Sequence, residues 1–126
     1  MNTYFLAAAA TIFLVGLAHS VLGEKLIFQR LRHNGRMVPS HGSHVLGSGH
    51  VRILWASWHI VTVFGWSMGL LLLQLATAAG PTSGFVAQAI ALSALVAALL
   101  VFVGTRARHP GWAGLLAVSV FVWLGI

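Results

Sequence analysis

Four long apolar stretches, separated by shorter polar or basic segments, set the pattern of the chain. They cover residues 3–22, 53–76, 85–103 and 110–126. Because a helix needs about 20 apolar residues to cross the hydrocarbon layer of a bilayer, we predict four transmembrane helices. The last stretch is the shortest, and it barely crosses the layer even if its helix begins at Pro110, a residue that suits a first helical turn.

Small residues recur at helical spacing along these stretches. They are Gly16 and Ser20 in the first, Gly65 and Gly69 in the second, and Ala87, Ala91, Ala94 and Ala98 in the third. Such faces let membrane helices approach closely, within one subunit or between copies. The short connections near residues 77–84 and 104–111 make neighbouring helices antiparallel. We therefore predict an all-α fold, a single membrane domain over residues 1–126 that forms an antiparallel four-helix transmembrane bundle.

The composition supports a membrane protein. Hydrophobic residues make up 59% of the chain and charged residues only 6%, against about 25% charged residues in a soluble domain. This excludes a cytoplasmic enzyme, a nucleic-acid module and a disordered tail. Since the sequence contains no cysteine, disulfides and thiolate metal sites are excluded as well.

The charges are placed unevenly. Seven Lys and Arg residues oppose one acidic residue, Glu24, and all seven lie in or beside the connections at 24–52 and 104–111. By the positive-inside rule, these connections face the cytoplasm and both termini face the outside of the membrane. We expect anionic lipid headgroups, and no nucleic acid, to contact these cations. The main headgroup contacts are predicted at Lys25, Arg30, Arg106 and Arg108.

The second stretch carries a polar and aromatic stripe. Its members lie within about 80° of one another around a helix, and they are Arg52, Trp55, His59, Thr62 and Trp66. His19 and His59 lie inside predicted spans, about 6 and 10 Å below the cytoplasmic surface. Their helices are antiparallel neighbours, so the two imidazoles can meet. Ionisable groups inside a bilayer tend to face a bundle interior, which predicts a polar site here.

Two further residues can join this site, Glu24 at the inner end of the first helix and His109 before the fourth. On a continuous helix Glu24 lies about 140° from His19. It turns inward only if the helix ends or bends at Gly23, and otherwise it forms a surface ion pair with Lys25 or Arg52. His109 either joins the site or contacts lipid headgroups.

Imidazole and carboxylate ligands suit a transition metal, and two facing histidines suit the axial positions of haem b. The predicted metal ligands are His19, His59, Glu24 and His109, and the predicted cofactor-binding residues are His19, His59, Trp55 and Arg52. Two alternatives stay open. One is an accessory or homo-oligomeric membrane protein without a cofactor, and the other is an oligomeric transporter or channel for protons or small solutes. An enzyme is the weakest class, because one carboxylate and no thiol leave few acid–base partners.

The long connection at residues 24–52 has two parts. In the first, Ile27 and Leu31 lie one helical turn apart among basic residues, which predicts that the first helix extends beyond the membrane or bends along its surface. The second contains His41, His44 and His50 among Gly and Ser residues. An H-x-x-H spacing can bind a metal weakly, but Gly and Ser offer no supporting hydrogen bonds, so we expect a solvated loop.

Two motifs carry a resemblance to a known group of proteins. The chain reads A-H-S-V-L-G-E at residues 18–24 and R-I-L-W-A-S-W-H at residues 52–59. It resembles a group of short bacterial inner-membrane proteins with four spans, which share A-H-S-x-L-G-E at the end of helix 1 and an R-x-x-W-x-x-W-H-like opening of helix 2. The resemblance covers about the first 70 residues. It implies an architecture and no particular reaction, and it places His19, Glu24, Arg52 and His59 at motif positions.

Overall fold

The structure is a computed structural model that describes residues 1–32, 35–77 and 79–126. Residues 33–34 of the predicted long connection and residue 78 of the predicted outer turn lie outside the described residues. The described residues form no strand, which confirms the all-α prediction. Their elements are α1 (Thr3–Leu26), the short 3-10 helix η1 (Phe28–Leu31), α2 (Ser48–Leu75), α3 (Ser83–Thr105) and α4 (Gly111–Leu124).

The helices begin where the sequence offers capping groups. The Asn2 side chain accepts from two backbone N–H groups in the first turn of α1, and the Thr82 hydroxyl accepts from one in α3. Pro110 occupies the N-cap of α4 instead of its first helical position. By length and composition three helical segments can cross a membrane, whereas α4, with 14 residues, is shorter.

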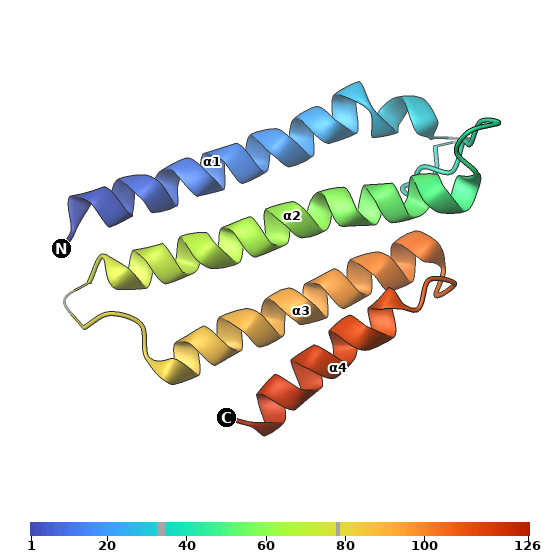
Figure 1. Cartoon of the computed structure of the whole chain (residues 1–126). Coiled ribbons are helices and arrows are strands. Elements are labelled where there is room, and N and C mark those ends of the chain that lie inside the picture. The colour runs from blue at the N-terminus through green and yellow to red at the C-terminus, as the bar shows by residue number, and fades with distance from the viewer. Residues whose placement is uncertain (33–34, 78) are drawn as a thin grey trace.

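The helices lie side by side in the order α1, α2, α3 and α4, each antiparallel to the next (Figure 1). Among the described residues, only consecutive helices contact each other extensively. They therefore form an open row, whereas a closed four-helix bundle also packs its first helix against its last. Large apolar side chains remain exposed along the row, among them Leu14 at 67% and Phe121 at 72%.

The predicted small-residue faces form the contacts inside this row. On α3, Ala91, Ala94 and Ala98 are buried, and the Ser119 hydroxyl of α4 donates to the Ala91 carbonyl at 2.9 Å. On α2, Gly69 faces α1, where an added Cβ would lie 2.9 Å from side-chain atoms of Ile12 and Phe13. The G-x-x-x-G pair of α2 thus packs within one chain.

The connection after α1 folds back onto the end of the row. It continues α1 through Leu26 and then makes the single turn of η1, so helical structure continues past residue 22, the predicted end of the first span. Phe28 is buried in a cluster with Trp55 and Val101. The Leu31 carbonyl accepts from two amides further along the connection, at 3.0 and 2.8 Å. This folding brings Arg32, the residue after η1, back over the α1–α2 pair.

The turn between α3 and α4 has an unusual backbone. Arg106 and Ala107 both have positive φ, 55° and 61°, a conformation that costs a non-glycine residue about 1 kcal/mol or more. The Ala107 amide donates to the Phe102 carbonyl at 2.8 Å, a bond typical of helices that end in a left-handed residue. The turn thereby holds two arginines, Arg106 and Arg108, beside the start of α2.

Candidate functional site

Polar and aromatic side chains of α2 face α1 along most of the helix pair. The Trp58 indole Nε1 donates to the His19 carbonyl at 2.9 Å, and the Trp66 Nε1 donates to the Phe13 carbonyl at 3.2 Å. These carbonyls already accept within α1, so each indole gains a partner without breaking the helix. In a membrane, where water offers no alternative partner, such bonds hold two helices in register.

Two glycines of α1 make room for these indoles. A Cβ added at Gly23 would lie 2.1 Å from the Trp58 Nε1, and one added at Gly16 would lie 2.4 Å from the Trp66 Nε1. Real Cβ atoms do not approach so closely, so both positions need glycine for steric reasons. The glycine of the A-H-S-x-L-G-E motif is therefore a packing residue.

Glu24 is the centre of a polar cluster at the basic end of α1 and α2. Its Oε1 accepts from the Trp55 Nε1 at 2.6 Å and from the His59 Nε2 at 3.0 Å, and its Oε2 accepts from the Arg32 guanidinium. The side chain of Glu24 is 26% exposed and that of His59 is 17% exposed. Charge-assisted bonds of this kind are stronger than neutral ones. The only acidic side chain in the sequence is thus bound by three donors.

A chain of hydrogen bonds continues from this cluster along the α1–α2 interface. The His59 Nδ1 lies 3.1 Å from the Ser20 hydroxyl, which lies 2.8 Å from the Thr62 hydroxyl, and Thr62 donates to the Gly16 carbonyl at 3.3 Å. From Glu24 to Gly16 the chain covers about 12 Å of helix. The α1 members are four residues apart, so one face of α1 supplies them all.

The number of protons available along this row of hydrogen bonds determines how many of the bonds can form at once. Four bonds link Glu24, His59, Ser20, Thr62 and the Gly16 carbonyl in turn. A neutral imidazole and two hydroxyls supply three protons, whereas an imidazolium supplies the fourth. The arrangement therefore makes every bond at once when His59 carries a positive charge beside the Glu24 carboxylate.

The structure joins only part of the predicted metal set. His19 stacks on the Trp58 indole, with ring centroids 4.3 Å apart, and its Nε2 lies 3.3 Å from the Trp58 carbonyl. His59 and Glu24 contact each other, while His109 lies at the start of α4, where its Nδ1 accepts from a backbone amide. In the part of the chain that the structure describes, no three His, Cys, Asp or Glu side chains gather closely enough to hold a metal ion.

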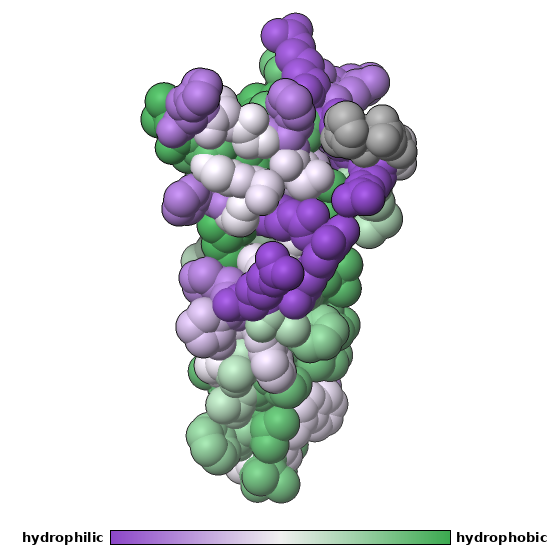
Figure 2. Space-filling model, turned by 90° about the vertical axis from the view of Figure 1, so that its right-hand side faces the viewer, coloured by the Kyte–Doolittle hydropathy of each residue, from purple (hydrophilic) through white to green (hydrophobic). Residues whose placement is uncertain are grey.

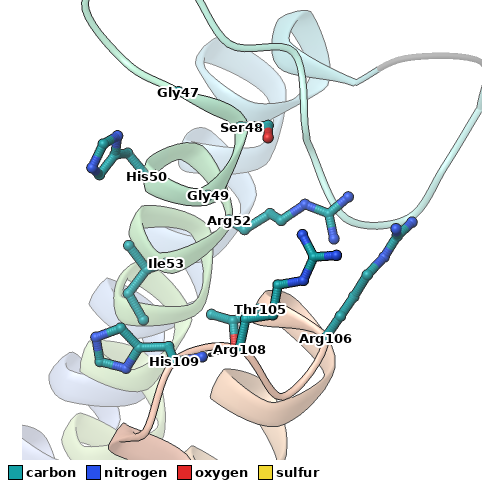
Figure 3. A pocket seen from close by; sticks show the side chains of 10 residues that line it. All are labelled: Gly47, Ser48, Gly49, His50, Arg52, Ile53, Thr105, Arg106, Arg108 and His109. Carbon is teal, nitrogen blue, oxygen red and sulfur yellow. Dashed lines mark hydrogen bonds between the residues drawn. The ribbon is translucent and has the colours of Figure 1, made fainter.

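Arg52 lies in a different environment from the other residues of the stripe, which bond to α1. It lines a pocket between the start of α2 and the α3–α4 turn, together with His109 and the two arginines of that turn (Figure 3). The Glu24 ion pairs seen among the described residues use Arg32 and His59 instead. The expected pairing of Glu24 with Arg52 or with the adjacent Lys25 is therefore absent from that part of the chain.

The other predicted residues of the basic end are on the surface. Lys25, Arg30, Arg106 and Arg108 are exposed, as headgroup contacts require. His41 and His44 are exposed in the long connection. The structure differs from the predicted loop at its end, because α2 begins at Ser48 and His50 is therefore helical.

Two members of the site were missed from the sequence. Arg32 reaches Glu24 because α1 ends at Leu26 and η1 follows it, and no local pattern in the sequence predicts that change of direction. Trp58 lies outside the predicted stripe, yet it contacts both ends of the A-H-S-x-L-G-E motif. The sequence did contain a signal for Trp58, because a large indole on α2 and a glycine on α1 are complementary in size and can pack together.

No family model, curated protein or solved structure matches the chain.

Proposed function

We propose that this chain is an integral membrane protein whose basic end faces the cytoplasm. Support comes from the three long apolar helices and from the apolar side chains exposed along the row. Figure 2 views the molecule from the end that carries the long connection and the α3–α4 turn, and hydrophilic residues cover much of that face. In a bacterial inner membrane the positive-inside rule places this end inside and both termini in the periplasm.

Single introduced cysteines test this topology cleanly, because the native sequence has none. In intact spheroplasts we expect a membrane-impermeant maleimide to label Thr77→Cys, which lies in the turn after α2. It should label His44→Cys, in the long connection, only after the membrane is permeabilised. Labelling of His44→Cys in intact spheroplasts, with Thr77→Cys protected, would reverse the proposed orientation.

Within the membrane, we propose a scaffold role in which a rigid α1–α2 hairpin holds the cationic end at the membrane surface, alone or as a subunit of a larger assembly. One observation carries this proposal: five polar side chains of α2 bond to atoms of α1, namely Trp55, Trp58, His59, Thr62 and Trp66. Glu24 accepts hydrogen bonds from three donors and so joins the two helices at their cytoplasmic end.

The contact between Glu24 and His59 favours a second candidate, in which this pair supplies a carboxylate and an imidazole to a transition metal or haem. A ligand role would require Glu24 to release part of its present bonding to Trp55 and Arg32. One experiment separates the two candidates. The protein is purified in mild detergent and analysed for metals and for a haem absorption band. The scaffold proposal expects substoichiometric metal and no Soret band.

A stoichiometric metal or haem that is lost in His59→Ala would instead establish the second candidate and overturn the scaffold proposal. Lys25→Ala is the matched control, since Lys25 adjoins Glu24 in sequence and its side chain is exposed. Metal that both variants retain would bind elsewhere, and it would leave the Glu24–His59 cluster to its role between the helices.

A further inference from the structure

Three of the cations that the Glu24 cluster does not use, Arg52, Arg106 and Arg108, line a pocket of their own. It has a volume of about 530 Å³ and lies between the first turns of α2 and the turn joining α3 to α4. Small-molecule sites commonly have volumes of about 300–1,000 Å³. Its walls come from segments more than 50 residues apart in the sequence, Gly47–Ile53 and Thr105–His109. The pocket is therefore produced by the fold and not by one basic run.

Three guanidinium groups meet at one side of this pocket. Figure 3 shows the side chains of Arg52, Arg106 and Arg108 gathered there, whereas the rings of His50 and His109 point the other way. Arg52 and Arg106 also line an adjoining pocket together with Arg36. Three positive charges at one side of a pocket repel one another, so the arrangement is electrostatically unfavourable until an anion enters.

The chain has no acidic side chain left for these arginines. Glu24 is the only one in the sequence, and it accepts from Arg32, Trp55 and His59. The left-handed backbone at Arg106 and Ala107 nevertheless holds the α3–α4 turn where its arginines face Arg52. Both the charge and the shape therefore call for a negatively charged ligand from outside the chain.

The start of α2 adds to the attraction. Its N-cap is Gly47, which has no side-chain oxygen to cap the N–H groups of the first turn. The first turn of this 28-residue helix, which carries the positive end of the helix dipole, therefore lines the same pocket as the guanidinium groups.

We propose that this pocket binds a phosphate group. A phosphate offers several oxygens to planar guanidinium groups, each of which can donate two parallel bonds, and it suits a helix N-terminus. The group can belong to a lipid headgroup, since the pocket lies at the basic end of the helices, or to a free phosphate compound. Phosphate binding as such does not depend on the scaffold role, and only the lipid source depends on the proposed membrane location.

The test compares two double variants of the full chain that remove equal charge. Arg106→Gln with Arg108→Gln empties the pocket of two guanidinium groups, and Lys25→Gln with Arg30→Gln removes two exposed cations outside it. Each protein, purified in mild detergent, is titrated with inorganic phosphate by calorimetry at constant ionic strength. Mixed micelles containing phosphatidic acid or only phosphatidylcholine form the lipid arm. Circular dichroism checks that the variants are folded.

With inorganic phosphate, we expect saturable binding by the native chain and the Lys25/Arg30 variant, and at least about tenfold weaker binding by the Arg106/Arg108 variant. With phosphatidic acid, whose headgroup Lys25 and Arg30 can also contact, we expect the Arg106/Arg108 variant to lose more binding than the Lys25/Arg30 variant. Binding of inorganic phosphate identifies a free phosphate source as sufficient, and binding of phosphatidic acid alone identifies the headgroup. Equal weakening in both variants would show a general charge effect and overturn the proposal. Absence of saturable binding in both arms would overturn it as well, while leaving the topology and the scaffold role to their own tests.

Discussion

Gly23→Ala should destabilise the protein by about 3 kcal/mol, one of the two largest losses that we expect from single substitutions. The added Cβ would lie 2.1 Å from the Trp58 Nε1 and 2.6 Å from a second indole ring atom. The indole must therefore move away, which breaks its bond to the His19 carbonyl and its stack on the His19 ring. Unfolding of the purified protein by SDS in mixed micelles, followed by circular dichroism, measures the loss.

Gly114→Ala is the matched control for this substitution. It also changes a helical glycine, but its added Cβ would meet nothing within 4 Å, and alanine favours a helix by up to about 1 kcal/mol. Its stability should be equal to or above that of the native chain. Combining Gly23→Ala with Trp58→Leu should recover part of the loss, because the smaller side chain leaves space. If Gly23→Ala were as stable as Gly114→Ala, the close approach of Trp58 to α1 would be wrong.

Glu24→Ala should cost about 2–4 kcal/mol, because it leaves three donors without their acceptor. These are the Trp55 indole, the His59 ring and the Arg32 guanidinium. Water can reach the partly exposed Arg32 and offset some of its loss, which places the expected value toward the lower end. Glu24→Gln keeps an acceptor oxygen and the shape of the side chain, so it should lose about half as much.

The same unfolding assay compares these variants with Lys25→Ala, which removes the next side chain along α1. Lys25 is exposed, and surface ion pairs contribute little, so this control should change stability by less than about 0.5 kcal/mol. A Glu24→Ala protein as stable as Lys25→Ala would show that the carboxylate has no structural role in the folded protein. In that case the polar cluster could not hold the two helices together.

The sequence predicted the helices and the α2 stripe because both depend on periodicity. Apolar runs and small-residue spacing determine where helices form and which sides approach, and Gly69 and Ala91 pack as that spacing predicts. The open row was not predicted. Short connections establish that neighbours are antiparallel, but they contain no information on whether α4 returns to α1.

The partners of the site residues were harder to predict. Glu24 faces α2 without any break at Gly23, because its position four residues after Ser20 already places it on the contact face. The prediction instead compared Glu24 with His19, which lies on a different side of the helix and stacks on Trp58. Arg32 depends on how a connection folds in space, and the spacing of residues along the chain does not encode that path.

A double-mutant cycle on Glu24 and His59 tests the central claim most directly. Glu24→Ala, His59→Ala and the double variant are unfolded under the same conditions, with Glu24→Ala and Trp66→Phe as a control pair, since Trp66 bonds at the Phe13 carbonyl, further along the helix pair. If carboxylate and imidazole bind each other across the two helices, their losses should fall short of additivity by about 1 kcal/mol or more, while the control pair adds. Strictly additive losses for Glu24 and His59 would contradict the account.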